Sequence, residues 1–151
     1  MKVRMRGLAG SERGSSLVET ALFMPVLLTL MLGVTDFGRA YYQANELEGA
    51  AHAGAVYGSQ YPTDTTDMQT MAVDNAPDVS GASATAVYGC ECSDGTGASA
   101  SCATTPTCTG TTEVYYVKVT VSASYSPLLP WSKFASPGTL SAVSEMRSTV
   151  P

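Results

Sequence analysis

The longest feature of the hydrophobic pattern is a run near the N-terminus. From Leu17 to Val34 the chain carries a single charged residue, Glu19, in 18 positions. A helix of this length spans about 27 Å, and two more residues bring it to the ~30 Å of a bilayer's hydrocarbon core. A small soluble domain rarely buries such a run on all sides, so the pattern predicts a transmembrane helix over residues 15–35. Pro25 within the run predicts a bend rather than a stop.

After this run the apolar residues recur at spacings of three and four, which is typical of one face of a helix. The helix is therefore expected to continue over residues 36–60, until Gly58 and Pro62 end it. The expected apolar face consists of Phe37, Tyr41, Ala44, Leu47, Ala51 and Ala55.

Residues 61–151 predict a small α+β domain. A short helix is expected over residues 64–75, where Asp64 can cap it. A strand is expected over residues 82–92, and a better one over 113–125, where apolar and polar residues alternate.

Residues 126–138 hold three prolines and predict a loop, with Trp131 and Phe134 as anchors to the core. Residues 139–150 fit a strand, although their pattern leaves a helix open. Two or three strands, forming a short antiparallel sheet on a long helix, are the expected arrangement.

Charge is distributed unevenly along the 151 residues. Four of the eight basic residues lie in residues 1–14 beside one acid, and 12 of the 13 acids follow. Basic residues before an apolar span predict a cytoplasmic N-terminus and a translocated remainder. A secretory signal peptide is the competing interpretation, but the run is long and the best cleavage triplet, Gly38-Arg39-Ala40, lies within the expected helix. A pI near 4.6 argues against nucleic-acid binding.

The sequence offers little catalytic chemistry. His52 is the single histidine, so no multi-histidine metal site can form, and no nucleophile elbow, metalloprotease motif or P-loop occurs. Asp36-Phe37-Gly38 matches the magnesium-binding tripeptide of kinases, but the other kinase motifs are absent. Asp36 and Arg39 more plausibly mark the exit from the membrane. We expect no enzyme, no cofactor and no metal ion.

Four cysteines lie in or next to a segment rich in serine and threonine, residues 93–112. They are Cys90, Cys92, Cys102 and Cys108. Their spacing is not a standard zinc pattern, and an even count outside the cytoplasm predicts two disulfides. A Cys90–Cys92 bond is geometrically poor. Two connectivities remain: 90–102 with 92–108, or 90–108 with 92–102. The stapled loop is either a subunit-contact or adhesive surface, or simply a rigid loop.

The residues at the start of the apolar run resemble the class III signal of type IV prepilins. Arg13-Gly14-Ser15-Ser16-Leu17-Val18-Glu19 is a basic leader ending in glycine, with glutamate at the fifth position after it. In that family a membrane aspartyl peptidase cuts after the glycine. The resemblance implies that leader 1–14 is removed between Gly14 and Ser15. It also implies that Glu19 pairs with the new N-terminal amine of a neighbouring subunit.

Residues 13–58 as a whole resemble the TadE-like family of the tight-adherence (Tad/Flp) pilus system. The residues that carry this resemblance are Gly14, Leu17-Val18-Glu19, Ala21-Leu22, Pro25, Gly33, Asp36-Phe37-Gly38-Arg39 and the Ala-rich stretch 50–55.

The resemblance implies a pilin-like fold, with a membrane-spanning helix that continues into a small periplasmic domain. It also implies a non-enzymatic minor pilin or pseudopilin of the bacterial inner membrane, which can enter an extracellular pilus. Its implied partners are other pilins, a prepilin peptidase and the pilus assembly platform. The alternative is a secreted or membrane-anchored extracellular binding module.

Overall fold

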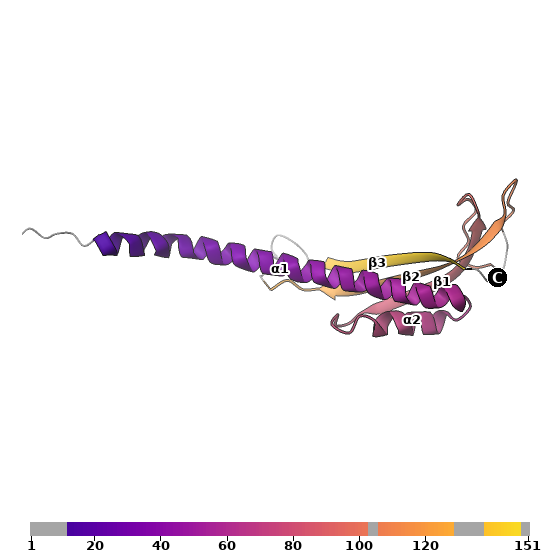
Figure 1. Ribbon diagram of the computed structural model, residues 1–151, viewed down its shortest axis with the longest axis horizontal. Coiled ribbons are helices and arrows are strands. Elements are labelled where there is room, and N and C mark those ends of the chain that lie inside the picture. Colours follow the sequence, from indigo (N-terminus) through magenta and orange to yellow (C-terminus); the bar gives the residue numbers. More distant parts are fainter. Residues whose placement is uncertain (1–11, 103–105, 129–137, 149–151) are drawn as a thin grey trace, which may run out of the picture.

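The computed structural model describes residues 12–102, 106–128 and 138–148, with side chains from residue 16 onward. Its elements follow in the order α1, α2, β1, β2, β3. The 49-residue helix α1 (Glu12–Gln60) extends far beyond the other elements, which gather along its C-terminal half (Figure 1). The chain therefore has a free helical arm and a small α+β domain built on the same helix.

Helix α1 runs without interruption through Pro25. The ring leaves one backbone carbonyl without its helical donor. Nearby, the Thr29 hydroxyl donates to the Pro25 carbonyl at 2.8 Å, and Thr20 and Thr35 make the same bond to the residue four positions earlier. These three threonine hydroxyls are therefore hydrogen-bonded within the helix and do not need a partner from their surroundings.

Helix α2 (Thr65–Asp74) occupies the predicted position and starts at the predicted cap. The Asp64 carboxylate accepts from the Asp67 backbone N–H at 3.1 Å. Met68 and Ala72 on α2 are buried against α1 and the sheet.

Three strands form one antiparallel sheet, with β2 (Glu113–Tyr125) between β1 (Ser83–Cys92) and β3 (Gly138–Ser148). At the centre of the register, Val119 lies opposite Ala86 on β1 and Ser144 on β3. The β3 range shows that the segment predicted as strand or helix is a strand. The anchors predicted in the preceding loop, Trp131 and Phe134, lie outside the described residues.

The core lies between α1, α2 and one face of the sheet. Helix α1 contributes Leu47 and several alanines, and β2 contributes Val117, Val119 and Val121, all fully buried. The small residues on α1 allow the sheet and α2 to approach the helix backbone closely. A Cβ built on Gly54 would lie 2.8 Å from the Met68 carbonyl oxygen and 3.1 Å from Val119 Cγ1.

The apolar face predicted for residues 36–60 is buried only in part. Leu47, Ala51 and Ala55 are fully buried, but Phe37 is 73% and Tyr41 63% exposed. The periodic pattern was read correctly as helical. The first turns of this stretch nevertheless contact the domain through Asp36, which is buried, whereas Phe37 and Tyr41 lie on sides of the helix that the described residues do not cover.

Candidate functional site

The N-terminal half of α1 is the largest apolar surface of the described molecule. Among the described residues, α1 is the one helix long and apolar enough to cross a membrane, and none of its most apolar 18-residue window is buried. Leu22 is 74% exposed and Leu30 62%. A soluble monomer rarely exposes a contiguous apolar patch of this extent, so this arm requires lipid or other helices around it.

The predicted processing residues lie at the beginning of this arm. Gly14 and Ser15 are in the first turns of α1, where only the backbone is described, and Glu19 follows one turn later with an exposed side chain. The structure thus places the processing residues at the N-terminal end of α1, remote from the four cysteines. It does not bring these two groups of predicted site residues together.

Exposed aromatic residues follow the apolar run. Phe37, Tyr41 and Tyr42 are 73%, 63% and 57% exposed, and they lie within two turns of Val34. Aromatic side chains with this placement are typical of the membrane–water interface, where an apolar ring and a polar tip are both accommodated. The end of the apolar run and these aromatic rings therefore indicate the same position along α1 for a membrane–water interface.

Asp36, two residues after the apolar run, connects α1 to the C-terminal end of β2. Its side chain is buried, and Oδ1 accepts from the Leu128 backbone N–H at 2.8 Å. The Tyr125 hydroxyl lies 2.7 Å from the Asp36 backbone carbonyl and 3.2 Å from Oδ1. Arg39, one turn further along α1, lies 3.7 Å from Oδ1. One carboxylate therefore fixes the end of β2 and the following turn against α1.

The phenol of Tyr125 responds to this environment. Burial, and then the charge and hydrogen bond of Asp36, raise the pKa of Tyr125 above its ordinary value of 10.0. The neutral hydroxyl is the form that donates to Asp36, so this contact requires the protonated phenol. Ionisation of Tyr125 would place two like charges together.

A second contact between α1 and the domain joins Tyr42, one turn after Arg39, to Asp78. Tyr42 donates to the Asp78 carboxylate at 3.1 Å, and the Asp78 backbone N–H donates to Glu46 at 3.2 Å. A cavity of about 300 Å³ lies beside this contact, lined in part by Arg39 and Gln43. Asp36 and this cluster thus hold two separate parts of the domain, the end of β2 and the segment at Asp78, to α1.

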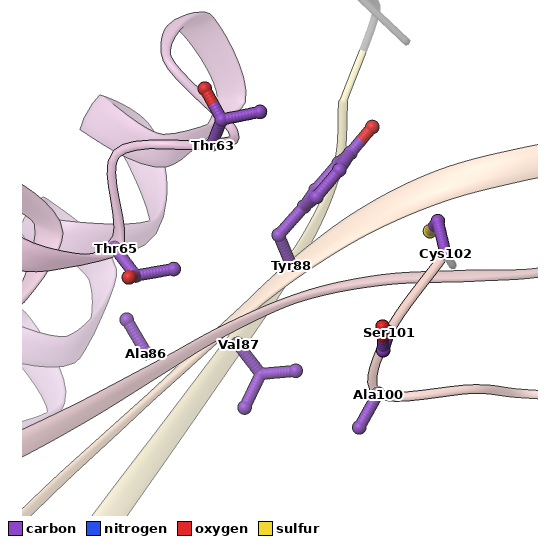
Figure 2. Close-up of a pocket in the computed structure, with 8 residues that line it drawn as sticks. All are labelled: Thr63, Thr65, Ala86, Val87, Tyr88, Ala100, Ser101 and Cys102. Carbon is purple, nitrogen blue, oxygen red and sulfur yellow. The ribbon is translucent and has the colours of Figure 1, made fainter.

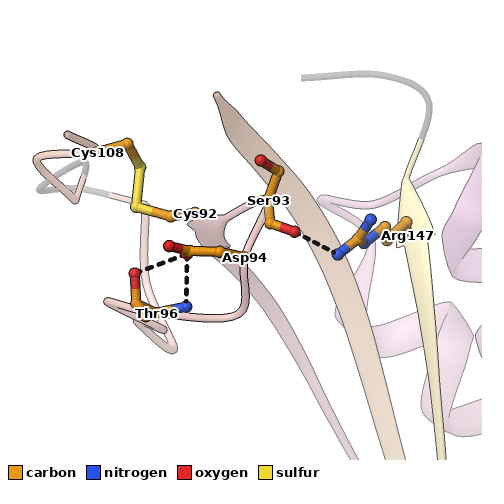
Figure 3. The surroundings of a disulfide bond; sticks show 6 residues. All are labelled: Cys92, Ser93, Asp94, Thr96, Cys108 and Arg147. Carbon is orange, nitrogen blue, oxygen red and sulfur yellow. Dashed lines mark hydrogen bonds between the residues drawn. A yellow bond between two sulfur atoms is a disulfide. The ribbon is translucent and has the colours of Figure 1, made fainter. Parts of the chain in front are cut away.

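Cys90 and Cys92 lie in the last three residues of β1, and Cys102 and Cys108 lie on the connection between β1 and β2. This connection is at the end of the domain away from the apolar arm (Figure 1). Cys92 and Cys108 form a disulfide with Cα atoms 5.5 Å apart. Beside the bond, Asp94 accepts from the backbone N–H and the hydroxyl of Thr96 (Figure 3). These hydrogen bonds, the hydroxyl's first, lower the pKa of Asp94.

Arg147 on β3 ties this loop to the sheet. It donates to the Ser93 carbonyl at 3.3 Å and lies 3.7 Å from the Glu91 carboxylate. The disulfide uses two of the four cysteines, which leaves too few thiols for a four-cysteine zinc site.

Cys90 and Cys102 are not bonded to each other in the structure, but their thiols are hydrogen-bonded neighbours. Cys102 borders a cavity of about 520 Å³ whose other walls include Thr63, Thr65 and Tyr88. Figure 2 shows Tyr88 rising from β1 between the threonines and Cys102. Of the two predicted connectivities, the observed bond belongs to the one that pairs Cys92 with Cys108.

Sequence reasoning placed Asp36 and Arg39 at the membrane exit but missed the role of Asp36 as the acceptor for Tyr125 and Leu128. Those partners lie 89 and 92 positions away. The signal available in the sequence is an acid at the end of an apolar run, which requires a partner if it is buried.

Comparison with known proteins concerns α1. The model of the TadE-like protein family matches residues 14–56. Neither the curated proteins nor the solved structures gave a significant match to the chain. The matched range begins at the glycine of the predicted leader and ends within the buried half of α1, so it takes in the apolar arm, Asp36 and the buried Leu47, Ala51 and Ala55. Over this helix the chain is similar to the TadE-like protein family, which is consistent with a protein of the Tad pilus system.

Proposed function

We propose that the chain is a minor pilin or pseudopilin of a Tad-type pilus, anchored in the bacterial inner membrane by α1 with its α+β domain in the periplasm. The observation that carries this proposal is the unburied apolar arm, within the segment that matches the TadE-like family. The basic residues before the arm favour a cytoplasmic N-terminus. The function is structural and requires no catalytic group.

The junction at Asp36 supports an anchor that is kept rather than a signal peptide that is removed. Cleavage after Ala40, the best signal-peptidase site, would detach Asp36 from the domain whose Tyr125 and Leu128 it holds. Cleavage after Gly14 leaves Asp36 and its contacts with Tyr125 and Leu128 in the same chain. Prepilin-type processing therefore keeps the contacts between Asp36 and the domain, whereas signal-peptidase cleavage after Ala40 would remove them.

Glu19 is the residue we assign to assembly. A carboxylate in the apolar part of a bilayer costs about 2.5–3.5 kcal/mol on insertion scales, so its presence there calls for a function. Cleavage after Gly14 creates an amine at Ser15, four residues from Glu19. That amine is positively charged and Glu19 is negatively charged. When helices leave the lipid and pack in a filament, the amine of one subunit would pair with Glu19 of the next, which offsets the cost of burying both charges.

The first test is the N-terminal residue and intact mass of the protein, from cells with and without the Tad-type prepilin peptidase. We expect Ser15 as the first residue only when the peptidase is present. An N-terminus near Tyr41 would identify a secreted binding module and contradict the pilin assignment. An uncut chain in both strains would contradict processing and leave only a membrane-anchored domain.

The second test separates processing from assembly. Glu19→Gln keeps the side-chain shape but removes the charge, so we expect cleavage to continue while co-purification with other pilins falls at least several-fold. Glu48→Gln is the matched control, since Glu48 is an exposed glutamate on the same helix beyond the membrane. Equal co-purification of both variants would contradict the role of Glu19.

A further inference from the structure

The β1–β2 connection folds back along β1 and carries Cys102 to Cys90. The Cys90 backbone N–H donates to the Ser99 carbonyl at 3.1 Å, and the Ser99 N–H donates back to the Cys90 carbonyl at 2.8 Å. This pair forms an isolated antiparallel bridge next to β1. Cys102 follows Ser99 by three residues, which is enough chain to turn its thiol toward that of Cys90.

The surrounding residues hold this approach in place. Gly89 lets the loop come close, because a Cβ at this position would meet the Ser99 carbonyl oxygen. The Tyr116 hydroxyl donates to the same carbonyl oxygen at 3.2 Å. Tyr88 and Tyr115 stack 5.9 Å apart beside the two cysteines. Residues of β1 and β2, as well as the loop itself, therefore hold Cys102 close to Cys90.

Cys90 is fully buried, and the Cys102 thiol lies within hydrogen-bonding reach of it. Nearby, the Cys92–Cys108 bond already closes the same loop. An adjacent buried pair of thiols in a compartment that oxidises its neighbour forms a disulfide unless geometry prevents contact.

We propose that Cys90 and Cys102 form a second disulfide in the mature protein. The two bonds then overlap along the chain, because Cys92 lies inside the loop closed by 90–102 and Cys108 lies outside it. The alternative connectivity, 90–108 with 92–102, is incompatible with the observed Cys92–Cys108 bond. The inference rests on the proposed function in one respect, the export of this domain to an oxidising compartment.

Formation of the bond requires an oxidant of the dithiol–disulfide class. The two thiols lose two protons and two electrons, the Sγ–Sγ bond forms, and the disulfide of the oxidoreductase is reduced to a dithiol. Burial, and then the hydrogen bond with Cys90, raise the pKa of the Cys102 thiol to about 12. Because the thiolate is the attacking species, exchange at Cys102 is slow in the folded domain.

The test is thiol counting on the full chain, purified in detergent without reductant and denatured in an alkylating agent. We expect no labelled cysteine before reduction and four after it. Two labelled cysteines before reduction would overturn the second bond and leave the export of the domain intact. Four labelled cysteines before reduction would overturn both the second bond and the proposed periplasmic location.

The pairing itself is tested with single variants. In Cys90→Ala the remaining free thiol should be Cys102, and in the matched variant Cys92→Ala it should be Cys108. Peptide fragmentation between residues 102 and 108 locates the label. A label on Cys108 in Cys90→Ala would overturn the proposed pairing. If a variant fails to fold, peptide mapping of the unsubstituted protein without reductant identifies the pairs, and a peptide linking Cys90 to Cys108 would overturn the proposal.

Discussion

At the scale of single residues, Asp36 shows how one carboxylate determines the relation between a helix and a sheet. It accepts hydrogen bonds from an N–H and a hydroxyl that belong to a turn and a strand end 89 to 92 positions away. Hydrogen bonds to charged groups are worth about 1.5–3 kcal/mol in proteins, more than neutral ones.

We therefore expect Asp36→Ala to lower the free energy of unfolding by about 2 kcal/mol, since it leaves the Leu128 N–H and the Tyr125 hydroxyl without that acceptor. The measurement is thermal unfolding of the full chain in detergent micelles, followed by circular dichroism. Asp74→Ala is the control, because Asp74 is exposed at the end of α2. Equal loss in the two variants would show that Asp36 has no special role.

Tyr125 gives this junction a pH dependence. Its pKa in the folded protein is raised above the unfolded value of 10.0, so the folded state favours the protonated phenol. Its contribution to stability is therefore complete below pH 10 and is lost as the pH rises through the folded pKa.

Tyr125→Phe should thus be less stable than the unsubstituted protein at pH 8, and this difference should narrow above about pH 10. Melting temperatures of both proteins between pH 8 and 11 measure it. Tyr61→Phe, at an exposed tyrosine beyond the end of α1, is the control. A difference that stays constant over the whole range would contradict the linkage to Asp36.

At the scale of elements, the chain's periodicity was sufficient for the helices and strands, and insufficient for their contacts. The 113–125 strand was predicted with its observed limits because Val117, Val119 and Val121 alternate with polar residues. The long helix follows equally from its apolar length and spacing. The exposure of Phe37 and Tyr41 does not follow, because the pattern cannot tell which side of the helix the domain covers at each level.

Gly54 tests the packing between elements. A Cβ there would lie 2.8 Å from the Met68 carbonyl and 3.0 Å from the Ala72 Cβ, so α2 would have to move. We expect Gly54→Ala to destabilise the domain by about 1–3 kcal/mol in thermal unfolding, as overpacked cores do. Gly49→Ala, on the same helix with no atom within 4 Å of its Cβ, should be neutral or stabilising. The reverse order would contradict close packing at Gly54.

The apolar arm makes a separate prediction for α1. Leu27 is 56% exposed in the middle of the run, and an arginine there costs about 2.5–3.5 kcal/mol of insertion free energy. Leu27→Arg should shift the protein from the membrane fraction to the soluble or degraded fraction in carbonate extraction. Val56→Arg, at an exposed site in the other half of α1, should stay in the membrane. Retention of both variants would contradict the span.

At the scale of the whole molecule, the candidate site was predictable where it is local and unpredictable where it is long-range. The apolar run is contiguous, so its length alone predicts the exposed helix that the structure shows, while the roles of Gly14 and Glu19 stay predictions. The cysteine connectivity depends on the path of a loop, and the sequence leaves two choices. The Cys92–Cys108 bond distinguishes them, and no residue type in the sequence indicates that bond or the bridge between Ser99 and Cys90.

The unbroken helix also fixes a distance. Residues 36–60 continue the apolar arm without a break in the helix, and at 1.5 Å per residue they place the end of α1 about 37 Å beyond Asp36. The connection between β1 and β2 lies near that end (Figure 1). In the proposed membrane anchor, a force that draws α1 out of the lipid by one turn would therefore raise this connection by about 5.4 Å, with no break in the helix to absorb the movement. Displacement at the membrane and displacement at the far end of the domain are one and the same motion.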